Sequence, residues 1–325
     1  MNVLIINPGS SNVKYCLYEN NSVYLKRKIE LNKPIEQVGK EILAKIIKIG
    51  GKKIGKIAYR VVYSGKCKEH CVINKEVLKE LRKTIELNPN HMPQTIKLIE
   101  FFVKNTKAVH IACFDTVFHN SMPEIAKLYA IPFNLTKKYN IQRHGFHGLA
   151  HQAMSEKANA QKVITCQLGN GVSVSAVKDG KCIDTSMGFT PLEGLMMGTR
   201  SGNIDPALIE YLCRKENKSV SEITKILQKE SGLKGIANET DVRVLLKRKD
   251  YKAKLAVEMF CYAVKKQIGA YTAALNGVDC VVFSGGISSN PPIINKIMNG
   301  INAKYIVSYA NEQEVMFKIS IGFKD

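Results

Sequence analysis

The sequence lacks any hydrophobic run approaching the roughly 18–20 residues that a membrane-spanning helix needs, so we expect no membrane partner. The first residues, 1–7, lack the basic region and the small-residue cleavage site of a signal peptide. We therefore expect a cytoplasmic protein. The chain has 325 residues, of which 45% are hydrophobic and 23% are charged. This is ordinary globular composition, and the length suggests two domains.

Acidic residues are few. There are 28 Asp and Glu against 48 Lys and Arg, which gives a formal charge of +20. A nucleic-acid-binding protein would have such a charge, and so would an enzyme that attracts small phosphates and carboxylates. The sequence lacks long basic runs, an aromatic RNA-binding motif and the paired spacing of a zinc site. We therefore expect small anions as ligands and no nucleic-acid partner.

A regular cysteine framework is also missing. The nine cysteines are an odd number scattered from Cys16 to Cys280, unlike the disulfides of a small secreted protein. The densest cluster, Cys67, His70 and Cys71, falls short of the roughly four ligands of a zinc site. We interpret the cysteines as free thiols in a reducing compartment.

One local pattern occurs twice in the chain. A strand-like run at residues 3–7 is followed by a glycine-containing turn and a second run at 13–18. The runs at 163–167 and 172–177 repeat it, and the second of them ends in an Asp-Gly turn. Repetition over this distance predicts two similar domains, each opening with an antiparallel meander.

Helical periodicity dominates the remaining segments, and strands that alternate with helices indicate an α/β fold. The predicted helices are residues 36–47, 75–87, 92–103, 221–229 and 252–275. A further buried strand, residues 281–286, ends in glycines, and we expect the domain boundary between about residues 115 and 162.

Three glycine-containing turns could bind phosphate through successive backbone N–H groups. They span residues 7–14, 168–171 and 284–290, and the first adds the hydroxyls of Ser10 and Ser11 and the cation of Lys14. None has the spacing of a P-loop. Each alone is typical of an ordinary turn. Two such turns, from two related domains facing a cleft, would suit a nucleotide polyphosphate.

Other candidate residues stand in unusual surroundings. The loop at residues 185–206 is rich in Gly, Ser and Thr, and long irregular loops are usually functional. Within it, Arg200 is either an exposed side chain or a bidentate partner for carboxylate or phosphoryl oxygens. Asp115 follows a strand-like run and is either a helix cap or a metal partner or base. His147 stands between Phe146 and Gly148, and facing a ligand and a structural role both remain open.

These segments, in this order, resemble the acetate kinase family of acetate and propionate kinases. The resemblance covers nearly the full length, and the run at 184–206 is its most specific part. Its motifs are residues 7–11, 60–62, 114–116, 145–148, 168–171, 184–206, 281–287 and 311–312. Compared with typical members, the chain looks shortened between about residues 23 and 57 and again between 295 and 305.

The resemblance implies two actin- or sugar-kinase-like (ribonuclease H-like) α/β domains with a cleft between them. Residues 1–117 would form the first domain, with the tail at 313–325 packing back on it, and residues 118–312 would form the nucleotide-binding domain. The implied reaction is reversible phosphoryl transfer from ATP to acetate, and to propionate, giving acetyl phosphate and ADP. The family also implies Mg²⁺ (or Mn²⁺) and a homodimer.

The resemblance also assigns roles to individual residues. Those matching catalytic positions are Asp115, His147 and Arg200. Those matching the acceptor site are Arg60, for the carboxylate, and Val62, Asn90, Phe146 and Pro191, for the wall around the alkyl group. Those matching the metal site are Asn7 and Glu312. Those matching the ATP-binding segments are Lys14, Gln167, Leu168, Gly169, Asn170, Gly171, Asp241, Val242, Arg243, Gly286, Ile287, Ser288, Ser289 and Asn290.

The sequence departs from the family pattern at four places. Asn12 stands where a third serine is usual, Gln167 where a histidine is usual, and Asn90 where a leucine helps to line the methyl pocket. The third glycine turn ends in Ser288-Ser289-Asn290 rather than Gly-Glu-Asn. These departures bear on rate and substrate preference more than on reaction class.

Alternative functions remain within and outside this reaction class. A kinase for butyrate, propionate or a sugar alcohol would share the superfold. A nucleotide-binding relic without turnover is a further alternative. Arg60 and the loop at 184–206 favour a small carboxylate as acceptor. The joint presence of Asp115, His147, Arg200 and Glu312 argues against a relic.

Overall fold

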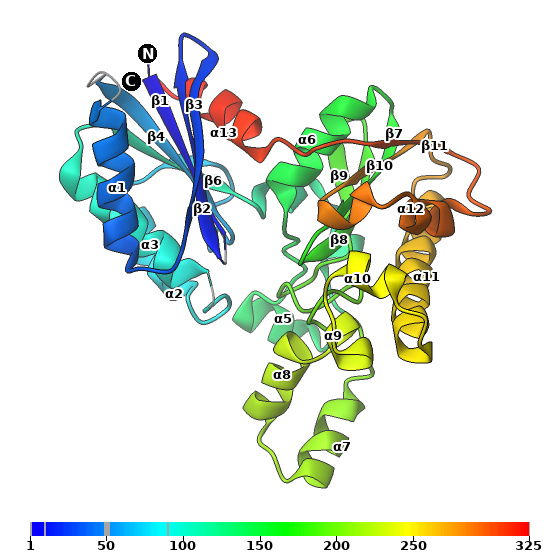
Figure 1. The fold of residues 1–325 in the computed structure, drawn as a ribbon. Helices are drawn as coiled ribbons and strands as arrows, with labels where there is room; N and C mark the ends of the chain where they lie inside the picture. Colours follow the sequence, from blue (N-terminus) through cyan, green and yellow to red (C-terminus); the bar gives the residue numbers. More distant parts are fainter. Residues whose placement is uncertain (1, 10, 49–52, 90, 325) are drawn as a thin grey trace. The chain divides into compact units, whose positions relative to one another are not determined.

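The structure is a computed structural model that describes residues 2–9, 11–48, 53–89 and 91–324. The candidate residues Ser10 and Asn90 lie outside the described residues. The chain forms two compact units (Figure 1). Unit 1 comprises Met1–Phe118 and Asn311–Asp325, and unit 2 comprises His119–Ala310.

Unit 1 is built on a mixed sheet with the strand order β3-β2-β1-β4-β6-β5. The first three strands form an antiparallel meander, and β4 and β6 continue the sheet in parallel with β1. The short β5 closes the edge in antiparallel orientation. The strands are β1 (Asn2–Pro8), β2 (Asn12–Glu19), β3 (Ser22–Glu30), β4 (Ile54–Val61), β5 (Cys71–Val72) and β6 (Val109–Phe114).

Burial along these strands follows their position in the sheet. The central strand β1 is buried on both faces, so it is a continuous apolar run rather than an alternating one. The edge strand β3 is mostly exposed and carries Lys26, Arg27 and Lys28, charges of the kind that protect an open sheet edge.

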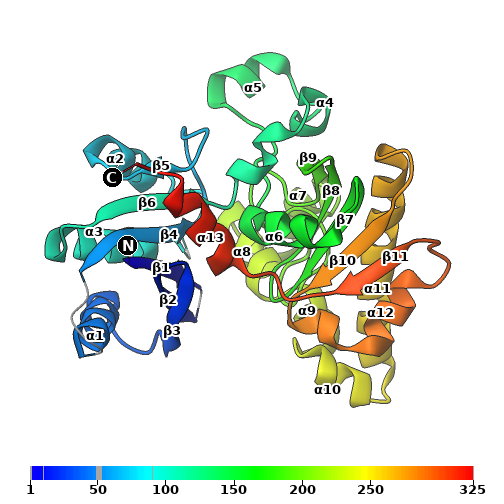
Figure 2. The ribbon, with the colours of Figure 1, turned by 90° about the horizontal axis from the view of Figure 1, so that it is seen from above.

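Helices cover both faces of the unit 1 sheet. Helices α1 (Ile35–Lys48), α2 (Lys75–Lys83) and α3 (Met92–Asn105) lie on one side, and α13 (Glu312–Ile321) lies on the other (Figures 1 and 2). The stripe Ile35, Val38, Ile42 and Ile46 gives α1 a buried face at helical spacing.

The end of the chain is anchored firmly to unit 1. The rings of Phe317 in α13 and Tyr18 in β2 are stacked, with centroids 4.1 Å apart and planes within 9°. Lys56 is only 2% exposed, and its Nζ donates a hydrogen bond of 2.5 Å to the backbone oxygen of Phe323. This anchoring fixes Glu312, the first residue of α13, relative to β1 and β4, on which α13 packs.

Unit 2 repeats the arrangement with the strand order β11-β10-β7-β8-β9. Strands β7, β8 and β9 form an antiparallel meander, and β10 and β11 continue from β7 in parallel orientation. The strands are β7 (Lys162–Leu168), β8 (Val172–Lys178), β9 (Lys181–Thr185), β10 (Cys280–Ser284) and β11 (Lys304–Val307). The repeated meander predicted from the sequence is therefore confirmed.

Two helices pack on the unit 2 sheet from opposite sides: α6 against β7 and β10, and α11 mainly against β8 (Figure 1). The unit's helices are α4 (Glu124–Lys127), α5 (Phe133–Tyr139), α6 (Gly148–Ala158), α7 (Ala207–Glu216), α8 (Val220–Lys229), α9 (Gly232–Ala237), α10 (Val242–Lys247), α11 (Tyr251–Ala274) and α12 (Pro291–Met298). Short 3₁₀ helices span Val117–Ser121 and Gly286–Ser289.

One predicted helix ends earlier than expected. The periodicity at residues 75–87 continues past α2, which ends at Lys83. Thr84 caps the end, because its hydroxyl donates to the backbone oxygen of Leu81 at 2.6 Å. The predicted helix is longer than α2 because Ile85 and Leu87 keep the apolar spacing. Pro89 disfavours a helical conformation for the residue before it, so the helix could not have continued far.

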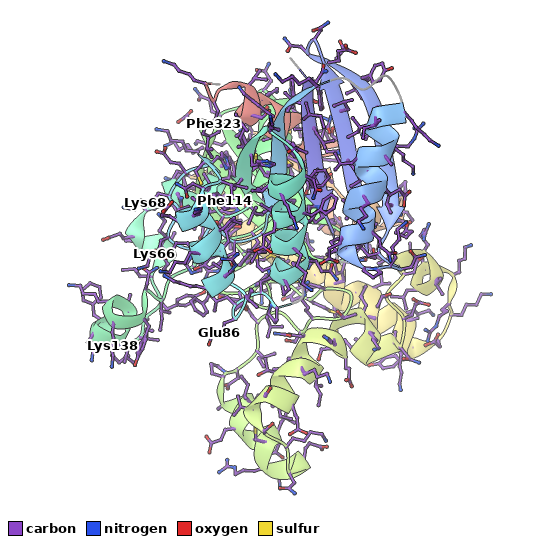
Figure 3. All side chains as sticks on the ribbon, turned by 90° about the vertical axis from the view of Figure 1, so that its left-hand side faces the viewer. Lys66, Lys68, Glu86, Phe114, Lys138 and Phe323 are labelled. Carbon is purple, nitrogen blue, oxygen red and sulfur yellow. The ribbon has the colours of Figure 1, made fainter. Side chains whose placement is uncertain are left out.

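Basic side chains project from the loop after β4 and from α5. Figure 3 shows Lys66, Lys68 and Lys138 pointing outward, while Phe114 lies inside unit 1. Among the described residues, no helix is both long enough and apolar enough to cross a membrane.

The Tyr18–Phe317 stack leads to a stability prediction. We expect Phe317→Ala to lower the free energy of unfolding by about 3–5 kcal/mol, because it removes a buried aromatic ring and leaves a cavity. Ile321→Ala is the matched control on the same helix, because Ile321 is 44% exposed. It should cost less than about 1 kcal/mol. Urea unfolding followed by circular dichroism measures both, and equal losses would contradict the anchoring role of Phe317.

Candidate active site

In unit 1, the candidate residues gather where three parallel strands end. Asn7 is at the end of β1, Arg60 near the end of β4, and Asp115 directly after β6. The strand register places Ile6 opposite Tyr59, and Arg60 opposite Cys113. Because carboxyl ends of parallel strands meet at one edge of a sheet, these side chains come together there.

The central contact of this cluster is the ion pair of Arg60 and Asp115. Arg60 Nε donates to both carboxylate oxygens, at 3.1 and 3.0 Å, and Nη2 donates to Oδ2 at 2.6 Å. Asp115 is fully buried, and its backbone N–H is bonded to the oxygen of Val61 at 2.9 Å. The carboxylate therefore fixes the plane of the guanidinium.

The other side of the guanidinium faces Asn7 and Glu312. Arg60 Nη1 is 3.4 Å from Asn7 Oδ1 and 3.9 Å from Glu312 Oε2, and Asn7 Nδ2 donates to the same Glu312 oxygen at 2.6 Å. Burial disfavours the charged form of Arg60, but the attraction of Asp115 and Glu312 outweighs burial and raises its pKa. Arg60 therefore stays a cation.

The cysteine cluster in unit 1 has no metal-binding geometry. His70 Nδ1 accepts a hydrogen bond from the backbone N–H of Phe114 at 3.1 Å, and burial lowers the pKa of His70 to about 4. Within the described part of the chain, no group of three or more His, Cys, Asp or Glu side chains is arranged to hold a metal ion.

In unit 2, His147 stands immediately before α6 in an unusual backbone conformation. Its φ of 57° lies in the left-handed region, which is costly for a residue with a side chain. The ring Nδ1 is 2.9 Å from Ser173 Oγ on β8. Backbone strain of this kind persists only where the surroundings hold it, and it often marks a functional residue.

His147 and Arg200 approach the same point, which Gly171 leaves open. A Cβ atom on Gly171 would lie 3.2 Å from His147 Nε2 and 3.3 Å from Arg200 Nη1. Arg200 donates to the backbone oxygen of Pro191 at 3.3 Å, and in the described residues it has no ion-pair partner. Burial therefore lowers the pKa of Arg200 without any compensating carboxylate. A cation in this state attracts an anionic ligand.

The loop that carries Arg200 is held by a network not anticipated from the sequence. Arg143 pairs with Glu193 at 2.8 Å and donates to the backbone oxygens of Thr185 and Ser186 at 3.3 Å each. The hydroxyl of Tyr129 donates to the same glutamate and accepts from the N–H of Phe189 at 2.7 Å. The long loop at 185–206 is therefore ordered by side-chain contacts rather than by regular structure.

Two glycine turns of unit 2 touch each other. Gly285, with φ of 94°, lies so close to the turn at 168–171 that a Cβ on it would be 2.3 Å from the oxygen of Leu168. Beside this contact, the buried Oε1 of Gln167 has no protein partner in the described residues, and Gln167 Nε2 faces Gly169. An acceptor left unsatisfied next to two glycine turns can bind a water or a ligand.

The remaining nucleotide-site candidates form local contacts. Ser288 and Ser289 donate to the backbone oxygens of Gly285 and Gly286, and Asn290 donates to that of Ile287. Asp241 caps α10 and pairs with the exposed Arg243, which lowers the pKa of Asp241 to about 2. Lys14 is exposed on β2.

The candidates for the acceptor pocket are divided between the units. Val62 in unit 1 and Phe146 in unit 2 are buried, at 8% and 3% exposure. Pro191 is half-buried and accepts the hydrogen bond of Arg200. Asn90 is outside the described residues, so its orientation stays a prediction from the sequence.

Comparison with known proteins finds one family that matches most of the chain. A family model described as the acetokinase family matches residues 26–314. The acetate kinase of Carboxydothermus hydrogenoformans is 40% identical over 91% of this chain and 85% of its own length. That of Thermotoga maritima is 40% identical over 90% of this chain and 84% of its own length.

Solved structures of such kinases are also similar to this chain. A propionate kinase from Francisella tularensis superposes with a TM-score of 0.92 at 33% identity, covering 99% of this chain and all of that one. Porphyromonas gingivalis acetate kinase gives a TM-score of 0.87 at 29% identity, with 99% of each chain covered. A ROK-family glucokinase from Streptomyces griseus, 10% identical with a TM-score of 0.53, shares the fold alone.

The buried ion pair allows a prediction about stability. Arg60→Ala should lower the free energy of unfolding by about 3–5 kcal/mol, because it leaves the fully buried Asp115 carboxylate without its counter-charge. Adding Asp115→Ala should restore part of that loss, because the orphaned charge is then gone. A double-mutant cycle by chemical unfolding measures the coupling. If the two losses in free energy of unfolding simply add, the predicted coupling is absent and the prediction is wrong.

Gly171 gives a prediction about activity. Gly171→Ala should keep the fold but displace His147, Arg200 or both by a few tenths of an ångström, because its Cβ would lie 3.0 Å from His147 Cε1. Since small misplacements of reacting groups are costly, we expect kcat to fall by about 10²-fold. Gly269→Ala is the matched control, because nothing lies within 4 Å of a Cβ there. Equal kcat in the two variants would contradict this prediction.

Proposed function

This chain belongs to the acetokinase family, and we propose that it catalyses reversible phosphoryl transfer from ATP to acetate, giving acetyl phosphate and ADP. The observation that carries the proposal is the approach of His147 and Arg200 to the point left open by Gly171. Phosphoryl transfer passes through a loose transition state with charge spread over the equatorial oxygens. A guanidinium without a counter-charge and an imidazole are donors suited to those oxygens.

In unit 1, we propose that Arg60 binds the carboxylate of the acceptor. Asp115 takes the Nε and Nη2 side of the guanidinium, which leaves Nη1 facing Asn7 and Glu312. Asp115 matches a catalytic position in the resemblance and stays a catalytic candidate. In this structure it is fully buried, so we propose that it acts by orienting Arg60. Acetate already carries a nucleophilic oxygen, so the reaction needs no strong general base.

We propose that Asn7 and Glu312 hold the magnesium ion of the family, through water or directly. An amide oxygen and a carboxylate are the hard donors that Mg²⁺ prefers, and Mg²⁺ commonly takes one or two protein ligands beside the substrate phosphates. The contact between Asn7 Nδ2 and Glu312 Oε2, 2.6 Å long, keeps the two side chains together. When bound, the ion would neutralise charge on the nucleotide phosphates.

For the nucleotide, we propose the glycine turns of unit 2. The contact of Gly285 with Leu168 forms one backbone surface from two turns, which a phosphate or sugar can approach closely. Gln167 and the segments 241–243 and 286–290 border the same site in our proposal. Gln167 offers hydrogen bonds but no charge, where the family usually has a histidine.

We propose that propionate is accepted as well as acetate. The likeness to a propionate kinase, at 33% identity, supports propionate as a second acceptor. An additional methylene gains about 0.8 kcal/mol when buried against an apolar wall, so propionate should bind at least as well wherever space allows.

We further propose a cytoplasmic homodimer. The cytoplasm supplies ATP as co-substrate, which is compatible with that compartment. Helix α7 has no buried residue in the chain itself and exposes Leu208 and Tyr211, at 39% and 50%, which suits a second copy as partner. Sedimentation velocity tests the dimer, and a monomer at micromolar concentration would contradict it.

Trapping the acyl phosphate with hydroxylamine tests the function directly. Acetate, propionate and butyrate are each supplied with ATP and magnesium, and chelation of the metal should abolish the signal until Mg²⁺ or Mn²⁺ is restored. Absence of acyl phosphate from all three acids would disprove the proposal. ADP release with a sugar alcohol instead would favour the rival kinase.

Within the same assay, Arg200→Ala should lower kcat by about 10³-fold or more, by analogy with arginine fingers. ATP affinity should stay within a few-fold. Arg200→Lys should restore little, because an ammonium group cannot make the planar bidentate contact. Arg82→Ala, which removes an arginine that is 56% exposed, is the control and should leave kcat unchanged. Near-normal turnover of Arg200→Ala would remove Arg200 from the site.

A further inference from the structure

Behind His147, a chain of buried polar side chains runs into unit 2. His147 Nδ1 is 2.9 Å from Ser173 Oγ, which is 2.7 Å from His151 Nε2. His151 Nδ1 is in turn 2.7 Å from Thr165 Oγ1. Ser173, His151 and Thr165 are each fully buried. We call Ser173, His151 and Thr165 the relay.

The relay is expensive for a protein core to keep. Each of its members would cost about 1–3 kcal/mol if left without a hydrogen bond, whereas apolar residues of similar shape would pack at no such cost. One end of the relay leads to a residue already held in the costly left-handed conformation. The buried relay and the left-handed backbone conformation both act on the imidazole ring of His147.

Proton counting links the relay to the state of His147. Burial lowers the pKa of His151 well below its usual value, and the neighbouring imidazoles of His119 and His147 would only lower it further. His151 is therefore neutral and carries one ring proton. Of the described residues, the two imidazoles are the partners of the Ser173 hydroxyl. Its single hydrogen therefore points to one ring, and the other ring donates to its oxygen.

We propose that Ser173 and His151, supported by Thr165, are positioning residues for phosphoryl transfer, which hold His147 so that Nε2–H faces the phosphoryl group beside Arg200. This rests on the proposed function. When the hydroxyl points at His147 Nδ1, a neutral His147 has its proton on Nε2. When it points at His151 instead, it accepts Nδ1–H from His147, and Nε2 then carries a proton only if His147 is a cation. A neutral His147 is therefore a donor at Nε2 only with the hydroxyl turned toward its Nδ1. This is the orientation that we assign, in which His151 Nε2–H donates to Ser173 and the hydroxyl of Thr165 donates to His151 Nδ1.

The described part of the chain places several titratable groups around His147. Arg200 approaches it at Gly171, and His119 lies behind His151, with ring centroids 5.7 Å apart. Helix α6 packs on β7 and β10, whose Cys166 and Cys280 have pKa values raised by burial. Lys162 lies at the opposite end of β7 from the residue paired with Ser173.

The test compares two buried serines on the same strand. Ser173→Ala removes the relay hydroxyl. Ser175→Ala removes a hydroxyl that is equally buried but bonded to Thr185 Oγ1 at 2.8 Å. We expect Ser173→Ala to lower kcat about tenfold or more with little change in KM for ATP, because only the transition-state contact weakens. Ser175→Ala should lose comparable stability and keep kcat within about twofold.

The pH profile and a conservative variant separate positioning from packing. In Ser173→Ala, the loss in kcat should be larger at high pH than at low pH, because a neutral ring is then no longer held with its proton on Nε2. Ser173→Thr, which keeps the hydroxyl, should restore most of the activity and the wild-type profile. A uniform loss at every pH, shared by Ser175→Ala, would overturn the proposal.

A double variant shows whether Ser173 acts through His147. His147→Ala should lower kcat, and adding Ser173→Ala should lower it no further, because the ring that the serine positions is already absent. If the double variant instead loses the full additional factor of Ser173→Ala, the serine acts elsewhere and the proposal is wrong.

Nitrogen NMR of the imidazole of His147, with and without inorganic phosphate, gives a readout that needs no turnover. Ser173→Ala should change the tautomer signal of His147, and Ser175→Ala should not. If the wild-type enzyme forms no acyl phosphate while this difference is seen, the proposed function fails and the relay stands. If the wild-type enzyme is active and neither the signal nor the pH profile changes in Ser173→Ala, the relay is refuted.

Discussion

The ion pair of Arg60 with Asp115 is the contact on which the geometry of the polar cluster in unit 1 depends. A guanidinium that is only 15% exposed needs a counter-charge, and a fully buried carboxylate provides it with two-pronged geometry. That pairing is possible because β4 and β6 run parallel as neighbours, so that residues near their ends meet. It also leaves Nη1 facing Asn7 and Glu312, so that one side of the arginine is held by short contacts and the other only by long ones.

The position of Glu312 in this cluster is set by the packing of α13 on unit 1. It arrives from the far end of the sequence, because α13 returns to pack on β1 and β4. The stacked rings of Tyr18 and Phe317 and the buried Lys56 hold that return in place. A cluster of four polar residues at one sheet edge thus joins three parallel strands and the last helix, and packing energy far from the cluster sets its geometry.

The sequence was informative where local chemistry decides the structure. Apolar runs and an Asp-Gly turn predicted both meanders, and strand-end positions suggested Asp115. Three features required tertiary contacts that no local pattern contains: the early end of α2, the Tyr129–Glu193–Arg143 network, and the relay behind His147. Ser173 is a serine at a strand position that would suit valine equally well. Its importance follows from which imidazoles lie across from it.

The buried cation of unit 1 has a counter-charge, whereas that of unit 2 has none among the described residues. This difference indicates which unit binds an anionic ligand more tightly. Unit 1 balances Arg60 internally, so a ligand there gains only what the remaining donor offers. Unit 2 leaves Arg200 unbalanced, strains the backbone at His147 and leaves an acceptor of Gln167 unsatisfied. Each of these is a stability cost that a bound ligand can offset. Because the donors of such a site are fixed before the ligand arrives, they stabilise charge on the transferring group without a cost of reorganisation. This reasoning supports our proposal that unit 2 stabilises the transition state and that unit 1 presents the acceptor.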